Sequence, residues 1–216
     1  MRTVLAALIL FALHGSAEAQ LELRVPFGTE LESVERGELD TDPTALRAVR
    51  ATNAAQSRRE GWWLFGWGLA STVAGGVLGI ALRDEPEWLS FGLTTAAFGA
   101  IDAGLAVGML DLAGSRRAAI ARDRLGDLTD PEAILEASIT RQRTSGQVFA
   151  FNLGLDVAYI TAGLLMFFLG RAREPAEGLL VGSGIGMISQ GAFLFGFDLA
   201  AWIHTGRRAD ALEALR

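Results

Sequence analysis

The sequence contains no cysteine and no lysine, and it has only two histidines, His14 and His204. The absence of cysteine excludes disulfide bonds, thiolate metal sites and cysteine nucleophiles. Two histidines are too few for a multi-histidine metal or haem site, and His14 lies in the expected signal peptide described below. We therefore expect no metal, no cofactor and no catalytic residue in this chain.

An excess of positive charge is also lacking, because the formal net charge is -6 and the pI is near 5.0. A basic surface is the footprint of nucleic-acid binding, so we expect no nucleic-acid partner. The hydrophobic fraction of 50% is ordinary for a soluble protein, but its distribution is not. Charged residues are nearly absent from four long windows and crowded between them.

The four windows are each longer than the roughly 20 residues that a transmembrane helix needs. They cover residues 62–82, 88–112, 146–170 and 178–203. Tryptophans stand at their ends, where an indole prefers the headgroup region: Trp62, Trp63, Trp88 and Trp202. The turns between the first two windows and between the last two are short. These features predict an all-α integral membrane protein of four transmembrane helices, arranged as two hairpins.

The N-terminus has the pattern of a cleavable signal peptide over residues 1–19. Arg2 is followed by an apolar run that is too short to cross a bilayer, and Ala17-Glu18-Ala19 forms an A-x-A cleavage site. An uncleaved signal anchor is the alternative. Residues 20–40 are acidic and aperiodic, which predicts an extramembrane tail.

The two halves of the chain resemble tandem copies of one unit. Thr41-Asp42-Pro43, which is typical of a helix start, recurs at residues 129–131. Asp111-Leu112-Ala113 recurs at residues 198–200, and a pair of arginines follows each copy. An even number of crossings gives both copies one orientation, which predicts a parallel pseudo-two-fold axis along the membrane normal. The expected units are repeat 1 over 41–113, a connector over 114–128, repeat 2 over 129–204 and a C-terminal tail over 205–216.

Two features disagree about orientation. A signal peptide places the N-terminus, the connection over 113–145 and the C-terminus outside. The same segments hold most of the arginines, however, and the positive-inside rule prefers the reverse. We expect the signal peptide to decide, because translocation of the first segment commits the rest, and we expect a bacterial cytoplasmic (inner) membrane.

Polar residues at membrane depth form the candidate site. Asn152, Asp156 and Tyr159 share one helical face, and Asp102 lies near the centre of the second window. An aspartate at this depth costs roughly 2.5–3.5 kcal/mol on insertion scales, so it usually faces the bundle interior. Gln190 in the fourth window is a candidate partner. The sequence therefore predicts an interior polar cluster of these five residues.

A second set of charged residues stands near the window ends. Each of two aspartates is followed by two arginines, and their simplest interpretation is interfacial ion pairing worth little energy. A lipid-headgroup site is the sharper alternative. The set comprises Asp111, Asp198, Arg116, Arg117, Arg207 and Arg208.

The second half carries two motifs, an FNxGLDxxY-like stretch from Phe151 to Tyr159 and a QGxFxxxFD-like stretch from Gln190 to Asp198. In these motifs the chain resembles an uncharacterised family of bacterial membrane proteins, a domain of unknown function, over most of residues 45–204. The resemblance implies a signal peptide and four spans, and it supplies no activity. Members of that family carry Trp-Asn and a further Asn in the second span, where this chain has Phe98, Gly99 and Asp102.

Three functional hypotheses follow. The first is a structural or interaction protein that binds protein partners, or further copies of itself, through its extramembrane helices, with the lipid bilayer as its medium. The second is a small channel or carrier for an ion, proton or small polar solute. The third is a membrane-embedded enzyme, although the sequence indicates neither a nucleophile nor a substrate pocket. A continuous polar track across the bundle would favour transport, whereas a sealed cluster would favour the structural role.

Overall fold

A computed structural model describes residues 41–172 and 177–216, and in these two stretches the regular structure is helical. The predicted signal peptide and the predicted tail, residues 1–40, lie outside the described residues. The elements are α2 (Pro43–Ala81), α3 (Pro86–Leu110), α4 (Ser115–Ala121), α5 (Pro131–Arg171) and α6 (Glu177–Glu213).

The two Thr-Asp-Pro sequences begin helices α2 and α5. The Asp42 carboxylate accepts a hydrogen bond of 2.8 Å from the N–H of Thr44, and the Asp130 carboxylate accepts one of 2.8 Å from the N–H of Ala133. Proline follows each aspartate as the first helical residue, where its missing N–H costs nothing. The cap and the proline together explain why both helices start at these positions.

Within the described residues, four helices are long and apolar enough to cross a membrane. Helix α5 has 41 residues, so it is about 60 Å long at 1.5 Å per residue, twice the thickness of a bilayer's hydrocarbon core. Helices α2 and α6, with 39 and 37 residues, are similarly long. The apolar windows therefore occupy only part of each of these helices, and the remainder extends beyond them.

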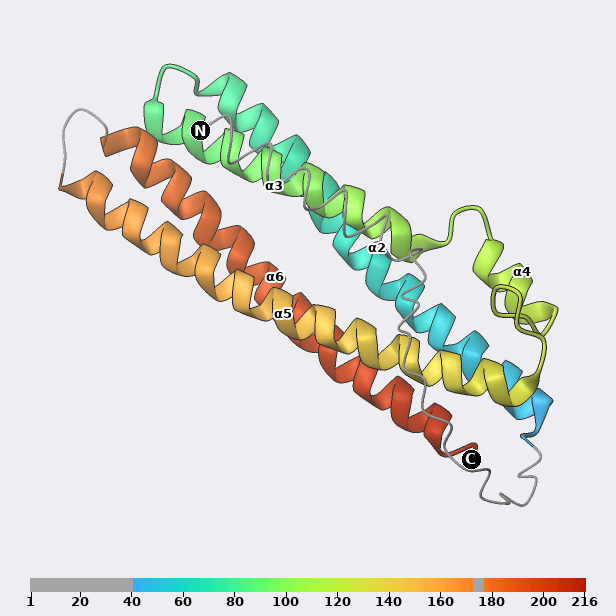
Figure 1. The fold of residues 1–216 in the computed structure, drawn as a ribbon. Helices are drawn as coiled ribbons and strands as arrows, with labels where there is room; N and C mark the ends of the chain where they lie inside the picture. Colours follow the sequence, from blue (N-terminus) through green and yellow to red (C-terminus); the bar gives the residue numbers. More distant parts are fainter. Residues whose placement is uncertain (1–40, 173–176) are drawn as a thin grey trace.

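The helices form two hairpins, α2 with α3 and α5 with α6, which meet mainly through α3 and α6 (Figure 1). Helices α3 and α6 run parallel, because Gly178 lies against Pro86 and Gly186 lies against Thr94 two turns further along both helices. Within each hairpin the backbones approach closely at glycines. A Cβ atom on Gly92 would lie 2.5 Å from the carbonyl oxygen of Gly75, and one on Gly184 would lie 2.6 Å from that of Gly163.

Residues that the sequence register equates do not always have the same surroundings. Gly191 packs against α5, where an added Cβ would lie 2.9 Å from Ile160, whereas nothing lies within 4 Å of a Cβ on Gly104. Helix α3 ends at Leu110, with Asp111 in the left-handed conformation, whereas α6 continues straight through Asp198 to Glu213. The pseudo-two-fold symmetry itself stays a prediction.

The projecting helix ends form a second packed region, which we call the head and define as residues 43–60, 115–145 and 204–216. Its core is a cluster of buried aliphatic side chains from α2, α5 and α6: Leu46, Ile134, Leu135, Ile139 and Leu212. Surface ion pairs surround it, joining Arg47 to Asp123, Arg143 to Glu213 and Arg216 to Glu136. The head contains the 115–145 connection and the C-terminus, so these segments lie at one end of the bundle (Figure 1).

Candidate functional site

Three aspartates from three helices are buried inside the bundle. Asp102 on α3 and Asp156 on α5 are each 2% exposed, and Asp198 on α6 is 5% exposed. The first two lie in the interior, where the sequence placed them. Asp198 was expected at the interface beside the arginines that follow it, and this expectation is corrected. Because α6 does not break after Asp198, Arg208 lies ten residues, or about 15 Å, further along the helix.

Asp198 belongs instead to the polar cluster. Its carboxyl group lies close to that of Asp156 and to the side chain of Asn152. The cluster therefore brings together residues from α5 and α6 that the sequence had assigned to separate sets.

The three aspartates lack positively charged neighbours. In residues 41–172 and 177–216 none of them forms an ion pair. One oxygen of Asp102 and one of Asp156 also have no hydrogen-bond partner among these residues. Three uncompensated negative charges in one interior would repel each other and would each be costly to desolvate. The arrangement therefore leaves three carboxyl groups in one interior without a positive charge paired to them among the described residues.

Tyr159 lies on the α5 face that carries Asn152 and Asp156, as the helical spacing predicts. Its ring makes an edge-to-face contact with Phe98 of α3, with 5.3 Å between the ring centroids. Tyr159 therefore connects α5 to α3 beside the aspartates.

Gln190 contacts a different helix from the one expected. Its side-chain oxygen accepts a hydrogen bond of 2.8 Å from the indole N–H of Trp67, and its amide nitrogen donates one of 3.2 Å to Ser71. The Trp67 ring also stacks on Phe193, with centroids 3.9 Å apart. Sequence reasoning missed Trp67 and Ser71. The available signal was that Trp67 lies inside an apolar window, unlike the other four tryptophans.

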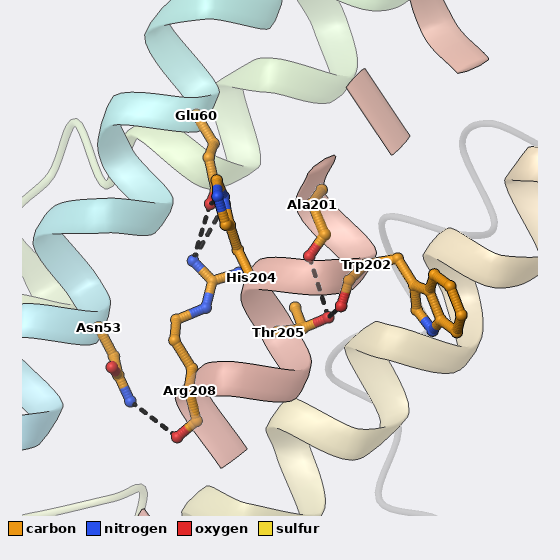
Figure 2. Close-up of polar contacts among 7 residues, drawn as sticks. All are labelled: Asn53, Glu60, Ala201, Trp202, His204, Thr205 and Arg208. Carbon is orange, nitrogen blue, oxygen red and sulfur yellow. Dashed lines mark hydrogen bonds and ion pairs between the residues drawn. The ribbon is translucent and has the colours of Figure 1, made fainter. Parts of the chain in front are cut away.

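A buried ion pair joins α2 to α6 where the apolar windows meet the head (Figure 2). One guanidinium nitrogen of Arg208 lies 3.1 and 3.0 Å from the two carboxylate oxygens of Glu60, and Nδ1 of His204 lies 2.9 Å from the same carboxylate. Asn53 donates a hydrogen bond of 3.5 Å to the Arg208 carbonyl oxygen. Arg208, predicted as an interfacial residue, is 4% exposed, and its partner Glu60 was not identified from the sequence.

Asp111 ends α3 and holds the start of α4. Its carboxylate accepts hydrogen bonds from the backbone N–H groups of Arg116 and Arg117, at 3.0 and 3.2 Å. The Arg117 guanidinium also forms an ion pair of 3.5 Å with it. Arg207 is exposed on α6. The expected pairing of an aspartate with following arginines is thus present at Asp111 and absent at Asp198.

The chemistry open to the interior cluster is the binding and sharing of protons. In the described parts of the chain, no three His, Cys, Asp or Glu side chains are grouped so that they could hold a metal ion. Helices α5 and α6 also approach closely here, since an added Cβ on Gly191 would lie 3.1 Å from the Asp156 carbonyl oxygen.

Comparison with known proteins gives one match. The model of a family described as a family of unknown function (DUF6992) matches residues 63–199. This stretch includes the four apolar windows almost completely and all three buried aspartates. No curated protein and no solved structure matches the chain.

Proposed function

The chain belongs to the family of unknown function DUF6992, and from that premise we propose that it is a non-enzymatic, structural or interaction protein of a bacterial inner membrane. Its four long helices anchor the head, and the head binds a protein partner or a second copy of the chain. The buried polar residues hold the helices together inside the bilayer. We also retain the two tandem repeats, related by a parallel pseudo-two-fold axis, as part of this proposal.

Exposed apolar side chains support the placement in a membrane. Ile80 is 75% exposed, Trp63 68% and Phe168 65%, and all three lie on long apolar helices. Large contiguous apolar surfaces on a protein mark contact with another apolar phase. A lipid bilayer supplies that phase around all four helices.

The observation that carries the structural role is that the interior polar groups are covered and connect neighbouring helices. Gln190 joins α6 to α2 through hydrogen bonds, Asp198 lies beside Asp156 of α5, and the Tyr159 ring contacts Phe98 of α3. Interhelical hydrogen bonds such as those of Gln190 hold membrane bundles together without transport or catalysis. The glycine contacts between backbones leave little width for a solute beside them.

A proton pathway is the second candidate, favoured by the absence of basic partners around the aspartates. Asp102, Asp156 and Asp198 offer three exchangeable protons in one interior. Acidic chains of this kind occur in pumps and transporters. This candidate requires that protons reach the cluster from both sides of the membrane.

Two substitutions of Asp156 separate the candidates. Asp156→Asn keeps the shape and the capacity to form hydrogen bonds but cannot titrate. Asp156→Leu removes both and leaves its partner unsatisfied, at roughly 1–3 kcal/mol. For a structural role we expect the Asn variant to keep the wild-type thermal midpoint in detergent and the Leu variant to lose stability.

Proton flux into liposomes supplies the second measurement. The structural proposal expects no flux from wild type above that of empty liposomes. A wild-type flux that Asp156→Asn abolishes at unchanged thermal midpoint would overturn it in favour of the proton pathway. Asp84→Asn in the exposed α2–α3 turn is the matched control, because it removes one carboxyl group outside the cluster.

The proposed orientation keeps the N-terminus, the 113–145 connection and the C-terminus outside and the two hairpin turns in the cytoplasm. The native chain has no cysteine, so single cysteines at Ser115 and Pro86 can be labelled separately in intact cells. An impermeant thiol reagent should label the cysteine at position 115 only. Labelling at position 86 alone would show that the chain has the opposite orientation, and it would leave the proposed fold unchanged.

A further inference from the structure

One face of α2 has an open hollow at the point where the apolar window begins. The hollow has a volume of about 360 Å³ and is lined by Ala55, Arg58, Arg59, Trp62 and Trp63. These residues recur at intervals of three and four, so they occupy one side of the helix. The hollow therefore faces away from the helices that α2 packs against.

The two arginines of this hollow have no ion-pair partner among residues 41–172 and 177–216. The next residue, Glu60, points toward α6, where Arg208 and His204 bind its carboxylate (Figure 2). Glu60 is thus paired in the interior and does not face the hollow. Within the described residues, Arg58 and Arg59 leave two positive charges without an ion-pair partner on the outer side of α2.

The tryptophans place the hollow at the level of lipid headgroups. Trp62 and Trp63 are 48% and 68% exposed at the first residues of the apolar window, where an indole ring is most favourable. The arginines precede them by about one helical turn, or roughly 5 Å, on the side of the head. This is the depth of the lipid phosphates.

We propose that this hollow binds the headgroup of an anionic phospholipid. The guanidinium groups of Arg58 and Arg59 hold the phosphate through paired N–H donors, a geometry that guanidinium matches well. The indoles of Trp62 and Trp63 cover the glycerol and the first acyl carbons. A lipid with net negative charge is preferred over a zwitterionic one, since a choline cation would add a third positive charge. The inference rests on the membrane placement proposed above.

Lipid-dependent thermal stability of the purified full chain in detergent tests this site. Phosphatidylglycerol or phosphatidylcholine is titrated into the micelles, and the thermal midpoint gives an apparent affinity for each. We expect phosphatidylglycerol to bind more tightly. The double variant Arg58→Gln with Arg59→Gln should bind it about 30-fold more weakly, since each arginine near an anionic surface contributes about 1 kcal/mol.

Two further variants separate the site from general charge effects. Arg58→Lys with Arg59→Lys keeps the charge but loses the paired N–H donors, so it should bind phosphatidylglycerol more weakly than wild type and more tightly than the glutamine variant. Arg122→Gln with Arg124→Gln removes two arginines from the head, far from the apolar windows, and should leave the affinity unchanged.

The proposal is overturned if wild type binds both lipids equally or if the Arg58→Gln/Arg59→Gln variant keeps the preference. It is also overturned if inorganic phosphate produces the same stabilisation, because the ligand would then be a free anion. A chain that stays monodisperse without detergent would overturn the membrane placement itself. That result is distinct from loss of lipid preference in a detergent-dependent protein.

Discussion

The head and the apolar windows of this chain are packed by different means, although the same three long helices run through both. In the head, α2, α5 and α6 contact one another through leucine and isoleucine side chains, and ion pairs lie on the surface. In the apolar windows, the large apolar side chains are exposed and glycines lie at the helix contacts. The polar groups there are buried instead.

The surrounding solvent explains the difference. Water drives apolar side chains of the head into a core, because burying them removes apolar surface from water. In the proposed membrane, lipid is as apolar as leucine, so helices there gain nothing from burying such side chains. Helices in lipid associate through close backbone contacts at small residues and through interhelical hydrogen bonds. The same helix can therefore bury apolar side chains in the head and expose them in its apolar window.

We expect the largest loss of stability when a charged side chain is removed at the boundary between the head and the apolar windows. Glu60→Ala would leave the buried Arg208 charge unpaired, and we expect a loss of about 3–5 kcal/mol in unfolding free energy. Denaturant or thermal unfolding in detergent measures it. Glu136→Ala removes an exposed partner of Arg216 and should cost less than about 1 kcal/mol. Equal losses in the two variants would contradict the burial of the Glu60–Arg208 pair.

The head should respond to a cavity as a soluble core does. Leu212 is 1% exposed within the aliphatic cluster, so Leu212→Ala should lower the stability of the head by about 2–5 kcal/mol. Limited proteolysis should show the head opening while the spanning helices stay protected by detergent. Leu165→Ala, at a 59% exposed position on α5, is the control and should be nearly neutral. If both changes were equally mild, the head would not be a separate packed core.

The spanning region should respond to added volume instead. Gly92→Ala would place its Cβ 2.5 Å from the backbone of α2, and overpacking of this kind costs about 1–3 kcal/mol. Gly76→Ala meets nothing within 4 Å and should be neutral or slightly stabilising, because alanine favours a helix over glycine. Thermal midpoints in detergent compare the two variants. Indistinguishable midpoints would mean that α2 and α3 do not pack through these glycines.

The smallest effect should be the pH dependence of an exposed pair in the head. The hydrogen bond from the Arg47 guanidinium, more than its charge, holds the pKa of Asp123 below the ordinary value of about 3.9. A lowered pKa in the folded state gives stability that is present above the unfolded pKa and is lost as the pH falls through the folded pKa. Asp123→Asn should therefore differ from wild type at pH 6, and the difference should shrink below about pH 4.

Thermal midpoints of wild type and Asp123→Asn at pH 6 and at pH 3 measure this dependence. Asp127→Asn, at an exposed residue of the same connection, is the control and should show no such convergence. A difference between Asp123→Asn and wild type that is the same at both pH values would show that the Arg47–Asp123 contact does not depend on ionisation.

The amino-acid sequence by itself determined that four helices are long and apolar enough to cross a membrane, as the described part of the chain shows. Each apolar window is long enough for a bilayer's hydrocarbon core, and an aspartate followed by proline marks a helix start locally. The inward face of α5 also followed from spacing, because Asn152, Asp156 and Tyr159 recur on one side of any helix. Membership of a family of unknown function agrees with the resemblance in the second half of the chain.

Only the tertiary structure decided which helices these polar side chains join. Asp111 and Asp198 have similar sequence surroundings, yet α3 ends at the first and α6 continues through the second. Asp111 therefore caps the helix that follows it, whereas Asp198 contacts Asp156 on α5. Gln190 likewise pairs with Trp67 and Ser71 because α6 packs beside α2 at that depth. Periodicity gives the face of a helix, but the neighbour opposite that face depends on how all the helices pack together.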